Sequence, residues 1–238
     1  MKTIPLLILA GGFGTRLRSA VSDVPKPLAP VEARPYLAYL IDSWYAQGAR
    51  SLIFLLHHQA GLIITFLAES QEAGQWPGCE IRSLVEPEPM ATGGAVAYAV
   101  RELGLTGSFL VANADTWLGA GLEAVAGAPA PAMAVIGVHD TARYGRVRVE
   151  SDKITAFEEK QGSSGPGLIN AGLYHLKADS LRNWDGQAFS MERELFPAMV
   201  SAKALTAVAL KTEFIDIGIP EDYFRFCRWI GSNMAGTL

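Results

Sequence analysis

Three glycines and two cations near the start of the sequence could together hold a phosphate group. An apolar run ends at Gly11, Gly12 and Gly14, and Arg16 and Lys26 follow. Glycine lets backbone N–H groups approach and surround phosphate oxygens, because no Cβ stands in the way. Arg16 can donate two parallel hydrogen bonds to a phosphate, and the two prolines beside Lys26 restrict its backbone. The segment predicts a phosphate-binding loop in which Arg16 and Lys26 stabilise charge on reacting phosphates.

The glycine segment matches neither of the two common nucleotide fingerprints. The dinucleotide-binding pattern G-x-G-x-x-G requires glycine where Leu17 stands, and the P-loop requires a later Gly-Lys-Ser/Thr, which is absent. A simple tight turn is the alternative to a phosphate loop. Leu17 also disfavours a dinucleotide-dependent oxidoreductase.

Composition and charge limit the class of protein. Half of the 238 residues are apolar, 18% are charged and the formal charge is −4, which excludes a disordered chain and a global basic field for nucleic acid or membrane. Only two cysteines occur, and no apolar run approaches the roughly 20 residues of a membrane span. We expect a soluble cytoplasmic protein whose local basic patch suits a small anion.

Strand-like and helical patterns alternate along the first half of the chain. Apolar runs predict strands at residues 4–10, 51–56, 80–86 and 108–113, and helical spacing predicts helices at 35–48, 62–72 and 94–103. This order favours a parallel sheet with helices on both faces. Ligands of such sheets bind outside the carboxyl ends of the strands, where the glycine segment lies.

The second half of the sequence does not continue the regular alternation of strands and helices. It predicts strands at 132–138, 168–176 and 205–210, a hairpin of 144–149 with 153–158, and helices at 190–201 and 220–230. Tyr223, Phe226, Cys227 and Ile230 recur at helical spacing and predict either core packing or a subunit contact, so a homodimer is possible.

Several motifs resemble the sugar-1-phosphate nucleotidylyltransferases, in the order in which that family carries them. The signature is L-A-G-G-F-G-T-R-L followed by V-P-K-P-L-A-P-V; further matches are A-T-G-G-A at 91–95, N-A-D at 113–115, F-E-E-K at 157–160, N-A-G-L-Y at 170–174 and F-I-D-I-G at 214–218. They extend from residue 9 to about 223. The A-T-G-G-A and G-L-I-N-A-G-L-Y segments look most like the heptose-1-phosphate guanylyltransferase subgroup.

The resemblance implies a fold and a set of nucleotide-binding residues. The fold would be α/β: a Rossmann-like, three-layer nucleotidyltransferase fold with a mostly parallel central sheet and an antiparallel sugar-binding portion. Residues 1–238 would form one domain, with a nucleotide-binding half to about 140 and a sugar-phosphate-binding half after it. The nucleotide-binding residues would be Leu9, Ala10, Gly11, Gly12, Gly14, Thr15, Arg16, Glu86, Thr92 and Gly93.

The implied reaction joins a sugar 1-phosphate to a nucleoside triphosphate and expels pyrophosphate. A phosphate monoester is already largely ionised at neutral pH, so the reaction needs charge neutralisation and positioning more than a general base. Arg16, Lys26 and Asp115 would be catalytic. Asp115 follows a predicted strand, Asp216 lies inside an apolar run, and by resemblance both would bind Mg²⁺. A turn or helix cap for Asp115 and a buried ion pair for Asp216 are the alternatives.

The sugar-phosphate residues follow from the resemblance alone. They would be Gly145, Glu159, Lys160 and Asn170, although Glu159 and Lys160 could also be an exposed charge pair on a hairpin. Residues 161–167 would form a flexible loop that could act as a lid. Ala114 stands where the family often has glycine, so the backbone there could lie farther from the ligand.

GTP and D-glycero-α-D-manno-heptose 1-phosphate are the favoured substrates, giving GDP-heptose for surface polysaccharide synthesis. Mannose-1-phosphate guanylyltransferase and N-acetylmuramate-1-phosphate uridylyltransferase remain alternatives within the family. A nucleotide-sugar sensor without catalysis is a non-enzymatic alternative, which the full catalytic set disfavours. His57 and His58 lack ligand-spaced partners for zinc, and Trp117 could either stack on a substrate or pack in the core.

Overall fold

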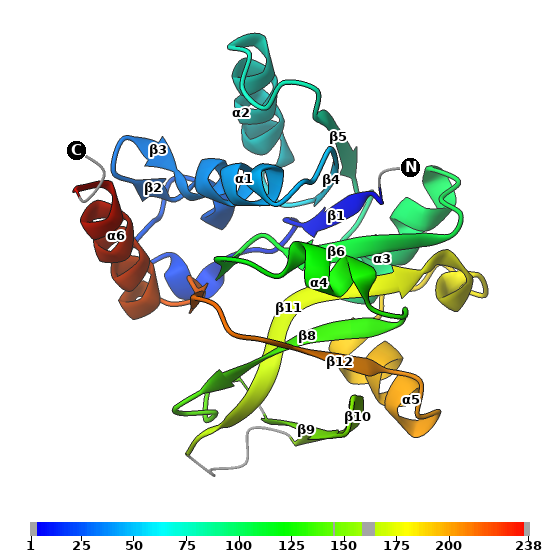
Figure 1. The fold of residues 1–238 in the computed structure, drawn as a ribbon. Helices are drawn as coiled ribbons and strands as arrows, with labels where there is room; N and C mark the ends of the chain where they lie inside the picture. Colours follow the sequence, from blue (N-terminus) through cyan, green and yellow to red (C-terminus); the bar gives the residue numbers. More distant parts are fainter. Residues whose placement is uncertain (1–3, 145, 159–164, 236–238) are drawn as a thin grey trace.

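A nine-stranded mixed sheet forms the centre of the molecule (Figure 1). The structure, a computed structural model, describes residues 4–144, 146–158 and 165–235. The strand order is β5-β4-β1-β6-β11-β8-β12-β10-β9. In sequence order the strands are β1 (Leu6–Leu9), β4 (Ser51–Leu56), β5 (Glu80–Val85), β6 (Ser108–Asn113), β8 (Ala132–Val138), β9 (Arg146–Glu150), β10 (Lys153–Glu158), β11 (Gly167–Lys177) and β12 (Thr206–Leu210).

The first four strands along one side of the sheet run parallel, as the alternating pattern predicts. On β1, Leu7 pairs with Ile53 of β4 and with Val111 of β6, and β4 pairs in parallel with β5. The carboxyl ends of these strands therefore meet at one edge of the sheet. The segments that carry Gly11, Glu86 and Asp115 leave the sheet at this edge.

The rest of the sheet is mixed rather than purely antiparallel. β11 runs antiparallel to both β6 and β8, and β10 runs antiparallel to β12 and β9. β8 and β12, however, pair in parallel. The chain between them passes through β11 and the helix α5 (Phe196–Ser201), so it returns to the sheet in the original direction.

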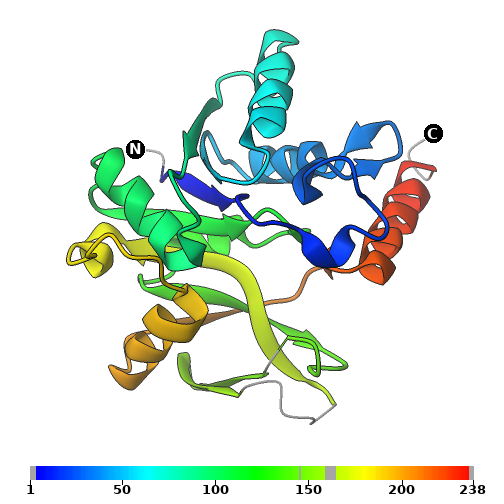
Figure 2. The ribbon, with the colours of Figure 1, turned by 180° about the vertical axis from the view of Figure 1, so that it is seen from behind.

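Helices cover both faces of the sheet, which gives the expected three layers. On β1, Leu6 and Ile8 face one core and Leu7 faces the other, because successive strand side chains alternate. The first core includes residues of α1 (Tyr36–Ala46), α2 (Ala60–Glu72), α4 (Leu122–Gly127) and α6 (Pro220–Ala235); the second includes residues of α3 (Ala91–Glu102) and α5. Figure 2 shows α3 and α5 from the side opposite to Figure 1.

Short elements complete the fold at the edge where the parallel strands end. Two small antiparallel ladders pair β2 (Pro30–Val31) with β3 (Arg34–Pro35) and β7 (Thr116–Leu118) with β13 (Phe214–Asp216). Single 3-10 turns are η1 (Thr15–Leu17) and η2 (Lys26–Leu28) at this edge and η3 (Ala178–Leu181) at the opposite edge, where Ala178 donates its backbone N–H to the Gly107 carbonyl oxygen before β6. Within the described residues, no helix has the length and apolar character that crossing a membrane requires.

One predicted helix divides into two elements. In place of a single helix over 190–201, a π-helical turn, η4 (Met191–Leu195), leads into α5. Ser190 caps the turn as expected, since its side chain accepts a hydrogen bond from the Arg193 backbone N–H. The side-chain carboxylate of Glu194 in turn accepts the Ser190 backbone N–H, at 3.0 Å.

Candidate active site

The glycine segment forms a close-packed loop directly after β1. A Cβ on Gly11 would lie 3.1 Å from both the Glu86 Oε1 atom and the His57 backbone nitrogen, so only glycine fits there without a shift. Gly14 has a left-handed φ of 60°, which favours glycine, and η1 follows it at once. Gly12 has open space around its Cβ position. The loop can therefore present its backbone to a ligand at Gly12.

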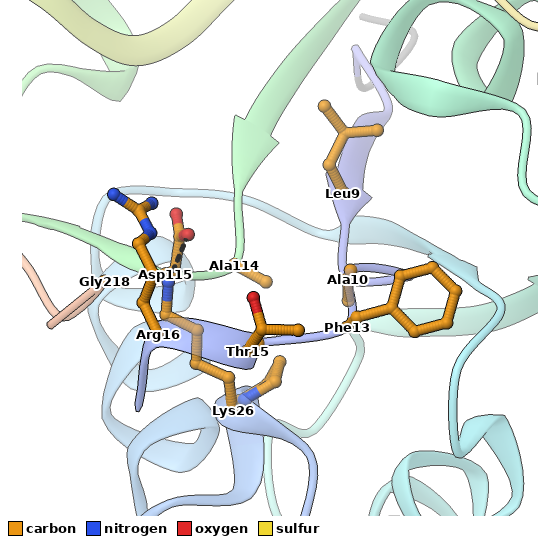
Figure 3. A pocket seen from close by; sticks show the side chains of 12 residues that line it. Leu9, Ala10, Phe13, Thr15, Arg16, Lys26, Ala114, Asp115 and Gly218 are labelled. Atoms are coloured by element: carbon orange, nitrogen blue, oxygen red, sulfur yellow. Dashed lines mark hydrogen bonds and ion pairs between the residues drawn. The ribbon is translucent and has the colours of Figure 1, made fainter. Parts of the chain in front are cut away.

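A cavity of about 410 Å³ lies against this loop (Figure 3). Four segments that are distant in sequence line it. They contribute Leu9, Ala10, Gly12, Phe13, Gly14, Thr15 and Arg16 from the end of β1 through η1, Lys26 and Pro27 from η2, Ala114 and Asp115 after β6, and Gly218 after β13. The fold thus gathers the three predicted catalytic residues, Arg16, Lys26 and Asp115, at one cavity.

Lys26 and Asp115 form an ion pair in the wall of this cavity. The Lys26 Nζ atom lies 2.6 Å from the Asp115 Oδ2 atom, with 11% of the lysine side chain and 36% of the aspartate side chain exposed. Thr116 donates a hydrogen bond from its hydroxyl to the Asp115 Oδ1 atom at 3.2 Å. Figure 3 shows Arg16 beside this pair, with Phe13 on the opposite side of the cavity. The cationic donors Arg16 and Lys26 and the Asp115 carboxylate therefore line the same cavity.

The small β7–β13 ladder brings Asp216 to Asp115. Asp216 pairs with Thr116 in the ladder, and Ile217 donates its backbone N–H to the Asp115 carbonyl oxygen at 2.9 Å. Burial and the nearby Asp115 charge raise the pKa of Asp216, while the Lys26 charge opposes that rise. The Gly218 backbone N–H donates to Asp216 Oδ1 at 2.7 Å. Two carboxylates 101 positions apart thus share one electrostatic environment.

This carboxylate pair fits a cation that is completed by ligands from outside the protein. Among the described residues, no group of three or more His, Cys, Asp or Glu side chains could hold a metal ion. Mg²⁺ commonly takes one or two carboxylates together with phosphate oxygens and waters. Asp115 and Asp216 match that donor set, so a bound polyphosphate would be needed to complete the coordination.

A second cavity, of about 310 Å³, adjoins the first and lies at the N-terminus of α3. The cavities share Leu9, Gly12, Phe13 and Asp115. The second is further lined by Gly11, His57, Glu86, Pro89, Met90, Ala91, Thr92, Ala95 and Asn113. Glu86 is 7% exposed, accepts the Met90 backbone N–H at 3.0 Å, and has a pKa raised by burial.

Thr92 and Gly93, both predicted to bind nucleotide, are packed against η4 and the segment before it. The Thr92 hydroxyl donates to Glu192 at 2.6 Å and accepts the Met191 backbone N–H at 3.0 Å, although Thr92 still lines the second cavity. Gly93 donates its backbone N–H to the Phe189 carbonyl oxygen, and a Cβ on it would lie 2.2 Å from the Phe189 ring. Gly93 therefore serves close packing here and lines neither cavity.

The sugar-phosphate prediction can be followed only at Asn170, since Gly145, Glu159 and Lys160 lie outside the described residues, as do residues 161–164 of the expected lid. Asn170 stands at an irregularity in the pairing of β11 with β8. Its amide nitrogen donates to the Tyr174 hydroxyl at 2.9 Å, and its oxygen accepts the Gly172 backbone N–H at 2.9 Å.

Sequence reasoning missed several residues that line the cavities. Phe13 is 49% exposed and borders both cavities, and Asn113 ends β6 at the sheet edge. Phe13 lies inside the L-A-G-G-F-G-T-R-L motif and Asn113 inside the N-A-D motif. Their places in these motifs could have identified them as candidate site residues. Trp117 packs against Phe226 and Trp229, with ring centroids 5.4 Å away in each case, which supports its core interpretation.

Comparison with known families decides which kind of protein carries this site. Residues 6–231 match the Nucleotidyl transferase family. The chain belongs to this family. The prediction of a nucleotidyltransferase, an enzyme with a mixed α/β fold, is therefore confirmed.

Individual members of the Nucleotidyl transferase family are similar over nearly the whole chain. D-glycero-alpha-D-manno-heptose 1-phosphate guanylyltransferase of Campylobacter jejuni is 33% identical, covering 92% of this chain and 97% of the relative. A probable mannose-1-phosphate guanylyltransferase of Oryza sativa is 32% identical, over 91% of this chain and 62% of its own length. The crystal structure of HddC from Yersinia pseudotuberculosis complexed with GMP-PN superposes with a TM-score of 0.82 at 30% identity, covering 95% of this chain and 99% of HddC.

Proposed function

We propose that this nucleotidyltransferase transfers a guanylyl group from GTP to D-glycero-α-D-manno-heptose 1-phosphate. A phosphate oxygen of the sugar attacks the α-phosphorus of GTP, and the bond to the β-phosphate breaks. The products are GDP-heptose and pyrophosphate. Residues up to about 140 bind the nucleotide in this proposal, and the later residues bind the sugar phosphate, apart from the segment with Asp216 and Gly218, which reaches the glycine-loop cavity.

The observation that carries the proposal is the meeting of Arg16, Lys26 and Asp115 at the glycine-loop cavity. The attacking group is an ionised phosphate and the leaving group is pyrophosphate, so the rate depends on stabilising negative charge. Arg16 can bind phosphate oxygens through two parallel hydrogen bonds, and Lys26 supplies a partly buried ammonium group. Gly12 leaves backbone space for the triphosphate.

The carboxylates Asp115 and Asp216 would hold Mg²⁺ in this proposal, and their shared electrostatic environment supports that role. When bound, Mg²⁺ would neutralise charge on the triphosphate. Thr116 orients Asp115 through its hydroxyl, and the Gly218 backbone N–H orients Asp216. The two acids are thereby fixed before any substrate enters.

Guanine recognition is supported by Glu86. An ionised carboxylate only accepts hydrogen bonds, and guanine presents two adjacent donors, its N1–H and its N2 amino group, whereas uracil and thymine present one N–H between two carbonyl oxygens. The Met90 N–H uses one of the acceptor positions of Glu86, so others are left for a base. The similarity to HddC complexed with GMP-PN points to the same class of nucleotide.

A substrate matrix tests the proposal directly. GTP, ATP, UTP, CTP and dTTP are each paired with heptose, mannose, glucose and N-acetylmuramate 1-phosphates, and released pyrophosphate is measured with Mg²⁺ present. We expect GTP with D-glycero-α-D-manno-heptose 1-phosphate to give the highest kcat/KM. A higher value with a uridine or thymidine nucleotide would overturn the guanylyltransferase assignment.

Mannose 1-phosphate is the second candidate acceptor. It is favoured by the 32% identity to the probable mannose-1-phosphate guanylyltransferase of Oryza sativa. The same matrix separates the two sugars. A kcat/KM at least tenfold higher with mannose 1-phosphate than with the heptose 1-phosphate would make mannose 1-phosphate the acceptor and would leave the assignment of GTP unchanged.

A further inference from the structure

A further cavity, of about 270 Å³, borders the glycine loop and takes no part in the proposed mechanism. Its lining comes from the loop and η1, from the segment that leads to η2, and from the two residues before α2. It shares Phe13, Gly14 and Lys26 with the glycine-loop cavity but only Phe13 with the second cavity. This cavity, which we call the Arg18 cavity, therefore adjoins the place proposed for the triphosphate and not the place proposed for the base.

Leu17 separates two arginines that line different cavities. Leu17 is buried, and its backbone N–H donates to the Gly14 carbonyl oxygen at 3.1 Å, which anchors η1 in the core. Arg16, on one side of Leu17, lines the glycine-loop cavity and not the Arg18 cavity. Arg18, on the other side, lines the Arg18 cavity and not the glycine-loop cavity. The turn thus divides two cationic side chains between two neighbouring cavities.

Arg18 gives its cavity a positive charge that the described part of the protein leaves unpaired. Across the described residues, no carboxylate forms an ion pair with Arg18, and the cavity lining contains no Asp or Glu. Lys26 also borders the cavity, but its ammonium group lies 2.6 Å from Asp115 (Figure 3). Asp23, the nearest acidic residue in sequence, lies outside the lining and accepts the Ser22 hydroxyl at 2.8 Å. An anion would supply the missing partner of Arg18.

His58 adds a hydrogen-bonding side chain to the same cavity. Its ring packs on Phe13, with centroids 5.1 Å apart, and its backbone N–H donates to the Gly11 carbonyl oxygen at 3.3 Å. These two contacts tie the segment before α2 to the glycine loop. An imidazole N–H can donate to a phosphate oxygen, so the cavity offers donors from two separate walls.

Size and charge together favour a small anion that contains phosphate. Pockets for drug-sized ligands measure about 300–1,000 Å³, and the Arg18 cavity is smaller than these. Arginine binds phosphate oxygens through parallel hydrogen bonds. The proposed reaction releases an anion of this kind, pyrophosphate, in the adjoining glycine-loop cavity.

We propose that the Arg18 cavity is a second anion site, which receives pyrophosphate as it leaves the glycine-loop cavity. Arg18 binds the pyrophosphate oxygens, and His58 donates a further hydrogen bond. No covalent bond forms or breaks there. This inference rests on the proposed function, because pyrophosphate is a product of that reaction.

Direct binding of pyrophosphate to Arg18→Gln tests the site. Calorimetric titrations are made in chelator, because a cavity without carboxylates does not need Mg²⁺ to bind an anion. We expect wild-type protein to bind pyrophosphate and Arg18→Gln to bind it at least roughly tenfold more weakly, since a hydrogen bond to a charged group is lost. Arg18→Lys, which keeps the charge but not the parallel hydrogen bonds, should have an intermediate Kd. Phosphate and sulfate, titrated in parallel, should bind more weakly than pyrophosphate; equal binding of all three would overturn a pyrophosphate site.

Two other arginines provide the controls. Arg182 is exposed, follows η3 directly and lines none of the three cavities, so Arg182→Gln should keep the Kd within twofold of wild type. Arg16→Gln separates the neighbouring cavities, because Arg16 lines only the glycine-loop cavity of the two. Binding that is lost in Arg16→Gln but kept in Arg18→Gln, or no binding to wild-type protein, would overturn the proposal.

Product inhibition tests whether the site acts during turnover. Formation of the nucleotide sugar is measured with added pyrophosphate, using the substrate pair that the wild-type enzyme turns over best. Saturating nucleoside triphosphate displaces pyrophosphate from the glycine-loop cavity but not from the Arg18 cavity. We therefore expect inhibition that persists at saturation in wild type and disappears in Arg18→Gln, with the KM for the triphosphate within twofold of wild type. A KM that rises as much as the Kd for pyrophosphate would place Arg18 in the triphosphate site and overturn the proposal.

Failure of this inference and failure of the proposed function give different results. The titrations contain no nucleotide or sugar, so their outcome does not depend on which substrates the enzyme uses. A preference for another nucleotide would overturn the guanylyl assignment and leave pyrophosphate as the product. A wild-type enzyme that turns over no tested pair would overturn the proposed function and, with it, the role of this cavity in product release.

Discussion

Replacing Glu86 by glutamine is expected to reverse much of the preference for guanine. The carboxylate is 7% exposed at the second cavity and already accepts the Met90 backbone N–H at 3.0 Å. Glutamine keeps one acceptor oxygen for Met90 but turns an NH₂ group toward the base. One of the two guanine donors would then face a donor. Uracil gains instead, because an amide can accept its N3–H and donate to a neighbouring carbonyl oxygen.

The expected size follows from the hydrogen bonds that change. A hydrogen bond to a charged group contributes about 1.5–3 kcal/mol, and 1.4 kcal/mol corresponds to roughly a tenfold change in an equilibrium constant. Loss of one such bond should therefore lower kcat/KM for GTP by roughly 10- to 150-fold. The effect should fall mainly on KM, because the base is remote from the reacting phosphorus.

The assay compares pyrophosphate release with GTP and with UTP at a fixed sugar 1-phosphate concentration. Glu88→Gln is the control, since Glu88 is exposed and lines neither cavity. It should leave the GTP-to-UTP ratio of kcat/KM unchanged. A Glu86→Gln enzyme that keeps the wild-type ratio within twofold would refute guanine recognition by Glu86.

Acidification offers an independent measurement of the same interaction. Burial raises the pKa of Glu86, so its carboxylate takes up a proton at a higher pH than an exposed glutamate would. The neutral acid is a poorer partner for the two guanine donors, and the KM for GTP should therefore rise as the pH falls. In Glu86→Gln the KM for GTP should not rise as the pH falls. If it still rises, a group other than Glu86 causes the pH dependence.

Three further outcomes follow from the geometry of the site. Lys26→Met removes the 2.6 Å ion pair with Asp115 and should lower kcat by roughly 10²–10³, measured as pyrophosphate release on protein of wild-type thermal stability. Chelation of divalent cations should abolish turnover and Mg²⁺ should restore it, whereas full activity in chelator would exclude the carboxylate pair as a metal site. Gly93→Ala places a methyl group 2.2 Å from the Phe189 ring and should destabilise the fold by about 1–3 kcal/mol in urea unfolding, while Gly61→Ala, in open space on α2, should be neutral or slightly stabilising.

The strands that sequence reasoning located best are those whose pattern is local and continuous. The predicted bounds of residues 51–56 and 108–113 agree with β4 and β6, because a buried parallel strand is an uninterrupted apolar run. The parallel pairing of β8 with β12 could not be read in this way. It depends on the path of the chain through β11 and α5, which no local pattern records.

The candidate site was predictable where its residues share a sequence segment and less so where long-range packing places them. Gly11 and Arg16 fall within one motif, and both lie at the loop after β1. Gly93 also belongs to a motif, yet its lack of a side chain makes room for the ring of Phe189, a residue 96 positions away. Glycine signals a close approach, but the sequence does not say whether a ligand or another part of the chain approaches.

The structure also explains why the loop after β1 lacks the third glycine of the dinucleotide fingerprint. In that fingerprint the third glycine lets a helix pack closely on the strand, and the helix N-terminus holds the pyrophosphate. Here the chain makes only the 3-10 turns η1 and η2 and a small β-ladder before α1 begins at Tyr36. Leu17, at the position of the missing glycine, is 1% exposed and packs in the core. Since an α-helix does not follow the loop directly, as it does in that fingerprint, positive charge at the loop comes from side chains. Arg16 and Lys26 supply this positive charge. Side chains of this length can place charge beside a reacting phosphate, at a position that a fixed helix end would not reach.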